Sequence, residues 1–553
     1  MNVLDTARTI DPLVGRDARD AVRFEEEARP RSAGRRAPKP LDWLAVRPGR
    51  RLCLGITALL VVLLVLASAV RCLEYDEAYT YFYLAGLPHP EWPLEPRPIA
   101  DLRAWIDGRS AGFAQIAADL VRWETHPPLH FWLMVPWRWM FGSDHLAPRL
   151  FSVLCAGVSM LAMWRLAALA RVPAIPAVLC TFLAYAVFHP ATLARAYALA
   201  LMLVLLGTLA LAKLLRDPEK GRTRPLDGSL LAFGAGMAFS LAGLSHYLAL
   251  VAGATIGGAF VATILAQRRI VPVVAMGLGG LPFFLMVMAI RAQQGSAEWF
   301  HPDFVLTRDL WRLFEMQAAA LFSRAPVLLD SPWNTVAAAL IAPCLLLIAG
   351  TVLAGLRPIV ADPVRRLLLF GAVAMPLGLL VFGLLTDRAP FVSRYASYSV
   401  PFCALSFAAG LGRLGERRPR LAAAVFGYVL LWQAVGAGSQ VVWPATQQEF
   451  RSIVADISTR WVPGDSVLVV PVGYDHVGKN GPFLWEAPGE WPMVVADVPA
   501  DRIVPNLDAA RNLFLVTFVE KNGESVLAQM RPALRAAGWT MTTVGEYHEV
   551  WTR

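Results

Sequence analysis

The feature that most constrains this chain is a succession of long apolar runs, each close to the length of a membrane-spanning helix. The first run, from Gly55 to Val70, contains no charged residue, and with its flanks it reaches the ~20 residues that a helix needs to cross a bilayer. Of the 553 residues, 56% are hydrophobic and 17% are charged, whereas about 25% are charged in a typical soluble chain. These observations exclude a soluble enzyme, a collagen-like chain and a disordered scaffold.

We predict an α-helical polytopic membrane protein with about 11 transmembrane helices. The predicted spans are residues 52–71, 148–168, 173–190, 193–214, 229–247, 248–266, 270–290, 333–355, 367–386, 397–412 and 421–441. Arginine-rich stretches lie between several of them, for example at 47–51, 213–224 and 413–420. Because basic residues gather on the cytoplasmic side of membrane proteins, these stretches predict a cytoplasmic N terminus and an extracytoplasmic C terminus.

The chain divides into three predicted regions. Residues 1–46 are charged and rich in proline and arginine, which is typical of a disordered cytoplasmic tail. The basic flank and the apolar run that follow them come too late in the sequence for a signal peptide. Residues 47–444 form the transmembrane domain, including an extracytoplasmic loop at 72–147 that carries candidate site motifs. Within it, the tryptophan-rich piece 129–142 predicts an interfacial helix. If this piece spans the membrane instead, every later loop lies on the opposite side of the membrane from the one predicted. Strands alternating with helices predict a small soluble, extracytoplasmic α/β domain over 445–553.

The net charge of +9 does not indicate a nucleic-acid partner, because the arginines are spread between apolar segments and are not gathered on one soluble face. The six cysteines lie in or beside apolar spans without a CxxC pair, so they imply neither a disulfide framework nor a zinc site.

Polar groups from remote parts of the chain fall on the outer face under this topology. They lie in residues 74–86 (EYDEAYTYFYLAG), 125–132 (THPPLHFW), 147–152, 189–199, 245–247 and 388–398. Each could simply mark where a helix meets water. Ionisable groups near the bilayer are costly and usually functional, so their convergence predicts a site.

Asp76 is the strongest candidate in this set. On a helix it shares a face with Thr80 and Tyr83, at i, i+4 and i+7, while Glu77 points about 100° away. A carboxylate beside an apolar, aromatic wall is a setting in which a general base can be tuned. The alternative is an ordinary capping or solvated acid that follows a span.

Three motifs give the chain a resemblance to a known family. Asp76–Glu77–Ala78 follows the first span, His126–Pro127–Pro128–Leu129 comes next, and Gly142-Ser143 runs through Arg149-Leu150 to Ser152. In this order they resemble the bacterial members of glycosyltransferase family 39, which include protein O-mannosyltransferases and the aminoarabinose transferases of lipid A. The resemblance extends to ARAYAL at 194–199 and SRYASYSVP at 393–401, and the C-terminal soluble part does not contribute to it.

The resemblance implies a GT-C fold and an enzyme that moves a sugar from a polyprenyl-phosphate donor to an extracytoplasmic acceptor. The catalytic pair would be Asp76 and Glu77, with Asp76 as the base. Many relatives carry a second acid in the fourth-span motif, where this chain has Ala196 and Tyr197, so any mechanism that relies on that acid is in doubt. The remaining implied partners are membrane lipids and an unidentified lipid, polysaccharide or protein acceptor at a bacterial inner (plasma) membrane.

Transfer from a sugar phosphate also requires neutralising the charge on the departing phosphate. Arginine suits bidentate phosphate contacts, and the candidates for donor-phosphate binding are Arg394, Tyr395, Arg195, Tyr197 and Arg149. The candidates for lining the substrate pocket are His126, His246, Tyr247 and Tyr83. We expect the C-terminal domain to be partly dispensable for donor binding, because it carries no donor motif.

No cofactor is predicted. A catalytic metal would want a cluster of acids, and Asp76 with Glu77 is the only close pair near the motifs, so metal-independent chemistry is favoured and a divalent metal stays open. A structural zinc held by some of four histidines is a further alternative. They are His89, His126, His130 and His301.

Two other function classes remain open. A transporter or flippase for a lipid-linked substrate should carry charges or broken helices at mid-membrane, but the predicted spans hold few ionisable groups at their centres. A non-catalytic receptor or assembly protein would leave the convergence of Asp76 with three arginines unexplained.

Overall fold

The fold is described from a computed structural model. The described residues are 48–87, 92–107, 111–124, 126–216, 225–292, 303–322, 333–442, 450–471, 478, 480–496, 500–517, 523–545 and 547–553. The predicted cytoplasmic tail, residues 1–46, lies outside them.

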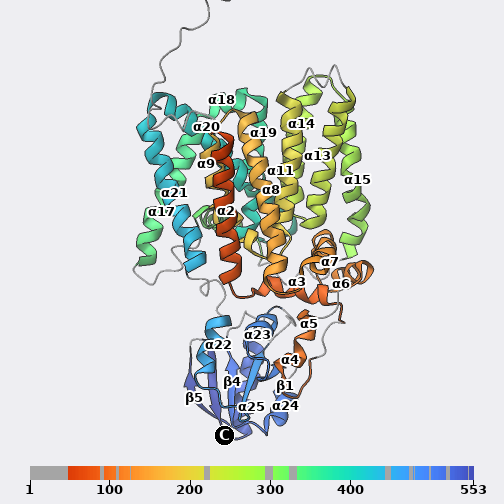
Figure 1. Cartoon of the computed structure of the whole chain (residues 1–553), viewed down its shortest axis with the longest axis vertical. Coiled ribbons are helices and arrows are strands. Elements are labelled where there is room, and N and C mark those ends of the chain that lie inside the picture. Colours follow the sequence, from red (N-terminus) through yellow and green to blue (C-terminus); the bar gives the residue numbers. More distant parts are fainter. Residues whose placement is uncertain are drawn as a thin grey trace, which may run out of the picture. The chain divides into compact units, whose positions relative to one another are not determined.

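The chain is a multi-pass membrane protein (Figure 1). Within the described ranges, eight helices are long and apolar enough to cross a membrane: α2 (Arg50–Val70), α8 (Leu146–Ala170), α11 (Tyr197–Arg216), α13 (Pro225–Ser245), α14 (Ala249–Ala266), α17 (Trp333–Ala354), α19 (Pro363–Thr386) and α21 (Pro419–Val442). A ninth crossing would be made by α9 (Ala174–Phe182) together with the segment Tyr185–Thr192, which contains α10 (Tyr185–Phe188) and η2 (Pro190–Thr192); the two halves are bent by 68°.

The predicted number of eleven spans is not confirmed, although a helix lies at each predicted position. The two remaining positions are α15 (Val271–Ala292) and α20 (Val400–Arg417). In α15 only Val271–Phe284 qualifies as an apolar helix. The last turns of α20 carry Arg413 and Arg417, and these charges lower its apolar character below that of a membrane span.

The bundle core is built of aliphatic and aromatic side chains from α2, α8, α9, α11, α14, α19 and α20. Because lipid tails are as apolar as leucine, close van der Waals packing holds such helices together in a bilayer. Many of the contact residues are small, among them Ala167, Ala200, Ala252 and Ala408, all fully buried. The bundle therefore forms a rigid support for the polar segments at its end.

The first loop supplies short helices. The candidate acid segment forms α3 (Tyr75–Ala85), which begins with a capping box between Glu74 and Glu77 and ends at Gly86, whose φ of 72° is left-handed and suits glycine. The amphipathic pattern of residues 100–110 (ADLRAWIDGRS) predicts one helix, which the structure divides into α4 (Ile99–Leu102) and α5 (Ala104–Asp107). The similar pattern of residues 113–124 predicts α6 (Phe113–Trp123), which is confirmed. The Trp-rich piece forms α7 (Leu129–Phe141), whose 13 residues fall short of the ~20 needed to span; its interfacial placement stays a prediction. The connection between α15 and α17 contains α16 (Leu306–Phe322).

The C-terminal region forms a six-stranded mixed sheet. Its order is β1 (Arg97–Pro98), β3 (Pro492–Ala496), β2 (Ser466–Pro471), β4 (Asn512–Val516), β6 (His548–Thr552) and β5 (Thr540–Val544). The three central strands are parallel, and the outer pairings are antiparallel. The apolar runs SVLVVPV, PMVVADV and LFLVTFV predict β2, β3 and β4. No such run predicts the C-terminal hairpin of β5 and β6 or the strand β1, which the first loop contributes.

Successive residues of the central strands face opposite sides of the sheet. Leu468 and Val470 pack against one group of side chains, and Val467 and Val469 against another. The helices α22 (Phe450–Ser458) and α23 (Asn480–Glu486) cover the first side, and α24 (Ala500–Ile503) and α25 (Gly523–Ala536) the second. The α/β character of the domain is as the sequence predicts. Leu73 and Tyr81 of the first loop join the first side.

Candidate active site

Asp76 lies opposite an arginine that comes from a much later part of the chain. Its Oδ2 is 2.9 Å from Nη2 of Arg394, which lies on η4 (Ser393–Tyr398). Burial disfavours the guanidinium charge, but the facing carboxylate of Asp76 and the neighbouring tyrosines together outweigh burial, and the pKa of Arg394 is raised. The two predicted residues are therefore in direct contact although more than 300 residues separate them along the chain.

A second arginine lies in the same place. Arg195 precedes α11 in the turn after η2, and its Nη2 is 3.3 Å from Nε2 of His126. The other ring nitrogen of His126, Nδ1, is 2.9 Å from Oε1 of Glu124. Burial opposes the charge of Arg195, while the carboxylates of Asp76 and Glu124 raise its pKa on balance. Arg195 thus lies in the field of two carboxylates.

Each of these arginines retains donor capacity. Nη1 of Arg195 and Nε of Arg394 are buried and have no hydrogen-bond partner among the described residues. Buried N–H groups of this kind are costly unless something pairs with them. A phosphate oxygen is a suitable acceptor because arginine presents several N–H donors in a planar fork.

Aromatic rings surround the two arginines. The guanidinium of Arg394 lies 5.8 Å from the ring centre of Tyr197. The ring of His246 lies 4.9 Å from Tyr197, 5.5 Å from Tyr395 and 5.6 Å from His126. The structure therefore brings together most of the predicted phosphate and pocket residues, and it adds Tyr398, 5.6 Å from His246.

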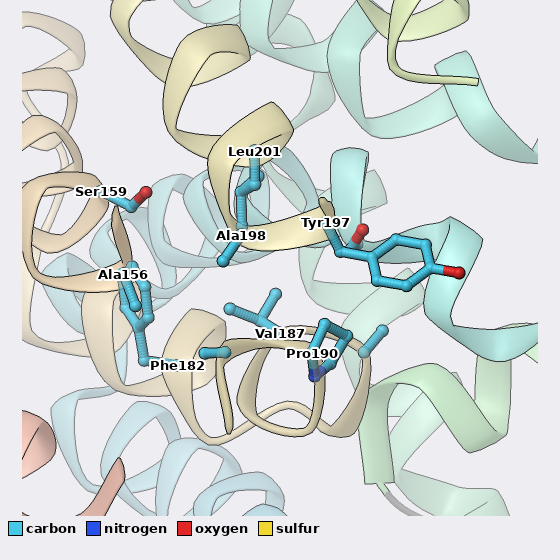
Figure 2. A pocket seen from close by; sticks show the side chains of 11 residues that line it. Ala156, Ser159, Phe182, Val187, Pro190, Tyr197, Ala198 and Leu201 are labelled. Carbon is cyan, nitrogen blue, oxygen red and sulfur yellow. The ribbon is translucent and has the colours of Figure 1, made fainter. Parts of the chain in front are cut away.

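A small cavity lies next to this cluster, between α8, α11 and the bent α9–α10 segment (Figure 2). Figure 2 shows the ring of Tyr197 pointing away from Ser159 and Phe182, which line the cavity. Its volume of about 10 Å³ has room for about one water molecule. The cavity is too small for a sugar, so the candidate site is the polar cluster that Tyr197 faces.

Glu77 points away from Asp76, as its position on the helix predicts. Nε and Nη2 of Arg149 donate to the two carboxylate oxygens of Glu77 at 2.8 and 2.5 Å. The remaining N–H groups of Arg149 donate to the carbonyl oxygens of Ser68, Arg71 and Cys72. Arg149, a predicted phosphate ligand, therefore has its five N–H donors engaged inside the protein.

Glu77 also accepts hydrogen bonds from the backbone. The backbone N–H of Ala194 donates to Oε1 at 2.8 Å, and that of Glu74 donates to Oε2 at 3.1 Å. Glu77, predicted with Asp76 as a catalytic pair, is fully buried. It joins the start of α3 to the segment just before Arg195.

A neighbouring polar cluster fixes the exit of the first span. Nη1 of Arg71 lies 2.8 Å from Nδ1 of His189 and donates to Thr192 and Gln440 at 3.1 and 3.2 Å. Arg71 also pairs with Glu74, the N-cap residue of α3. These contacts connect α2, η2, α21 and α3, so the base of α3 is held on several sides.

Two predicted pocket residues lie apart from the arginines. Tyr83 is buried at the far end of α3, with its ring 5.9 Å from that of Phe131 on α7. Tyr247 lies in the turn between α13 and α14, directly after His246, and is partly exposed. Of the helical face predicted for Asp76, Thr80 is fully buried as well.

The histidines considered for zinc are not all placed. His89 and His301 lie outside the described residues. Burial lowers the pKa of His130 to about 3, so this side chain is neutral. Among the residues that the structure describes, no group of three or more His, Cys, Asp or Glu side chains is arranged to hold a metal ion.

Several residues of the cluster are not predicted as site residues from the sequence. Glu124 was detectable, because it stands two positions before His126 in the stretch that ends in His-Pro-Pro. Glu74 begins the acidic stretch of α3, and Arg71 flanks the first span, but neither position reveals a distant partner. The pairing of Arg71 with His189 depends on the bend between α9 and α10, which no local pattern indicates.

Comparison with known proteins gives the fold. No protein-family model matches the sequence, and no curated protein matches it. Among solved structures, ArnT from Cupriavidus metallidurans in the apo state is similar, with a TM-score of 0.50, 14% identity, and coverage of 91% of this chain and 97% of that chain. The chain has a GT-C fold.

Two further structures are similar at lower scores. ArnT from Cupriavidus metallidurans bound to undecaprenyl phosphate has a TM-score of 0.49 and 13% identity, with coverage of 91% of this chain and 97% of that chain. The Archaeoglobus fulgidus oligosaccharyltransferase in its apo form has a TM-score of 0.47 and 12% identity, with coverage of 88% and 72%. The GT-C fold predicted from the motifs is confirmed, while membership of family 39 stays a prediction.

Proposed function

We propose that this GT-C protein is a membrane glycosyltransferase that moves a sugar from a polyprenyl-phosphate donor to an extracytoplasmic acceptor. The observation that carries the proposal is the contact between Asp76 and Arg394, with Arg195 beside them. A carboxylate can take a proton from the acceptor, and arginines can stabilise charge on a departing phosphate. Both requirements of sugar transfer are met in one cluster.

The proposed reaction is a direct displacement at the anomeric carbon. The acceptor oxygen forms a bond to this carbon while the bond from the carbon to the phosphate oxygen breaks. The electron pair of the broken bond leaves with the polyprenyl phosphate, and the acceptor proton passes to the carboxylate of Asp76. No cofactor is part of the proposal.

The arginines would bind the donor phosphate. Because Arg394 faces Asp76, a donor phosphate would compete for the guanidinium and release the carboxylate toward the acceptor. Tyr197 and Tyr395 would add hydrogen bonds. Arg195, oriented by His126, would take a further phosphate oxygen with its unengaged Nη1.

Most of the remaining predicted residues take other roles in the proposal. His246 and His126, whose rings are 5.6 Å apart, would contact the sugar, whereas Tyr247 and Tyr83 lie apart from the arginines and take no role in the proposal. Arg149 and Glu77 hold α3 in place, because their polar atoms are engaged with each other and with the backbone.

We further propose that the protein lies in a bacterial plasma membrane, with the N terminus cytoplasmic and the C-terminal domain outside. A phosphatase fused after the last residue should be active in the periplasm, and a fluorescent reporter that matures only in the cytosol should stay dark. The reverse pattern would mean that a predicted span is miscounted, with 129–142 the first to be reconsidered.

The decisive experiment follows the sugar. The purified protein, in lipid nanodiscs, is incubated with a radiolabelled polyprenyl-phosphate sugar and an envelope extract that supplies acceptors. We expect label to leave the lipid with the wild-type protein and to stay with the Asp76→Asn variant. Equal loss of label from both would remove Asp76 from the chemistry, and loss from neither would contradict the proposed activity.

A further inference from the structure

The helix that carries Asp76 is touched on its opposite side by the C-terminal domain. Ala78 follows Asp76 by two positions, about 200° around the helix, and it is fully buried. A Cβ atom built on Gly481, in the first turn of α23, would lie 2.5 Å from the Cβ of Ala78. The backbone of α23 therefore approaches α3 as closely as a glycine permits.

The far end of α23 holds the chain just before α3. Oε1 of Glu486 accepts a hydrogen bond from the backbone N–H of Leu73 at 3.1 Å. Arg451 donates to both carboxylate oxygens of Glu486, at 2.8 and 3.1 Å, and to the carbonyl oxygen of Val70 at 3.0 Å. The hydrogen bond to Glu486 raises the pKa of Arg451.

Two more contacts join α23 to the first loop. The ring of Trp485 lies 5.7 Å from that of Tyr81 on α3. Arg103 donates from Nε to the carbonyl oxygen of Leu484 and from Nη2 to that of Ala487, both at 2.7 Å. Residues of the C-terminal domain thus reach α3, the connector before it and the loop after it. They are Arg451, Gly481, Leu484, Trp485, Glu486 and Ala487.

The length of α3 explains why these contacts matter. An isolated helix of 11 residues is marginal in water, so tertiary contacts must set its position. Arg394 faces Asp76 on one side, and α23 lies against Ala78 on nearly the opposite side. A displacement of α3 at Ala78 would therefore change the distance between Asp76 and Arg394.

We propose that α23 is a positioning element of the transfer reaction, which holds Asp76 at its working distance from the phosphate-binding arginines. This inference rests on the proposed function. It assigns the C-terminal domain an effect on turnover rather than on donor binding, because α23 contacts the acid helix and neither Arg195 nor Arg394 is among its contacts described above. Misplacing a catalytic group by 1 Å can cost about 10²-fold in rate.

The test uses a substitution and its compensation. Gly481→Ala adds a methyl group that Ala78 obstructs, and we expect a fall in kcat of about 10²-fold, with the KM for the donor and the binding of undecaprenyl phosphate unchanged. Adding Ala78→Gly removes the obstructing methyl group and should restore most of kcat. Gly427→Ala is the matched control, because a Cβ at Gly427 meets nothing within 4 Å.

Glu486→Gln provides a second variant if Gly481→Ala does not fold. It keeps an oxygen for the N–H of Leu73 but loses the ion pair with Arg451, and we expect a smaller fall in kcat with unchanged donor binding. Wild-type kcat in both variants, or a change in KM alone, would overturn the inference. So would a loss of kcat in Gly481→Ala that Ala78→Gly does not relieve.

Hydrogen exchange separates this inference from the proposed function. The backbone amides of α3 should exchange faster in Glu486→Gln than in the wild type, whether or not the protein transfers a sugar. The wild type could move no label while α3 exchanges faster in Glu486→Gln. This result would contradict the proposed function but leave α23 as the element that holds this helix. Unchanged exchange would overturn the inference itself.

Discussion

Two acidic residues adjacent in the sequence have opposite surroundings. The side chains of Asp76 and Arg394 are 12% and 29% exposed and share one contact. Those of Glu77 and Arg149 are both fully buried, and every donor of Arg149 is engaged. The first pair can exchange partners with a ligand, whereas the second would leave buried charges unpaired if it separated.

The difference shows how one short helix serves two purposes. Consecutive positions on a helix point about 100° apart, so a pair of acids can face a site on one side and an anchor on the other. Breaking a buried ion pair by removing one partner is far more costly than changing an exposed one. Substitutions at the two pairs should therefore separate activity from stability.

The largest effect should come from Asp76→Asn. Asparagine keeps the shape of the side chain but cannot accept the acceptor's proton, so kcat/KM in the label-transfer assay should fall about 10²–10⁴-fold with the unfolding temperature preserved. Asp101→Asn, in the exposed part of the first loop, is the control and should behave as wild type. Turnover near the wild-type rate would make the assignment of Asp76 wrong.

Glu77→Gln should act on stability. Glutamine leaves the charge of Arg149 buried without a counter-charge, and the free energy of unfolding should fall by about 3–5 kcal/mol. Activity per folded molecule should change much less than in Asp76→Asn. Thermal unfolding and the label-transfer assay on the same preparation check this, and the opposite pattern, a stable but inactive protein, would place Glu77 in the chemistry.

Arg394→Lys should fold and insert normally but lose activity. Lysine retains the charge and loses the planar fork that grips two phosphate oxygens. A lost charged hydrogen bond of about 1.5–3 kcal/mol corresponds to a fall in kcat/KM of about 10–10²-fold. Arg388→Lys, six positions earlier and paired with Asp303, is the control in which no loss is expected.

Arg195→Lys should have the smallest effect of the four. Arg195 lies in the electrostatic field of Asp76, but its observed hydrogen-bond partner is the imidazole of His126, so we expect a fall of about threefold to tenfold. The double variant with Arg394→Lys should be worse than either alone. Full activity in both single variants and in the double variant would assign the phosphate to other groups.

The sequence predicts the parts of the fold that have a local signature. The apolar runs locate the membrane helices because a span needs an uninterrupted length of apolar residues. The strands at 466–471 and 512–516 are continuous apolar runs, which is typical of strands buried on both faces. The hairpin formed by β5 and β6 is missed, because Thr540–Val544 is largely polar and exposed.

The candidate site is predictable only as a set of residues. Spacing along α3 separates Asp76 from Glu77, but no spacing reveals that Arg394 faces one and Arg149 the other. Both pairings join residues more than 70 positions apart, and the fold of the whole bundle determines them. Arg149 and Arg195 look alike in the sequence; only the number of engaged donors distinguishes an anchor from a candidate ligand site.

The pairing of β1 with β3 has a consequence for how the chain is assembled. Arg97 and Met493 are neighbours in this sheet, although more than 390 positions separate them along the chain. Pairing of such distant segments is slow, since a long loop must close before any contact forms. Until β1 pairs with it, this edge of β3 is uncovered, and an uncovered strand edge invites pairing with another chain. The first loop therefore protects the sheet by covering the edge of β3.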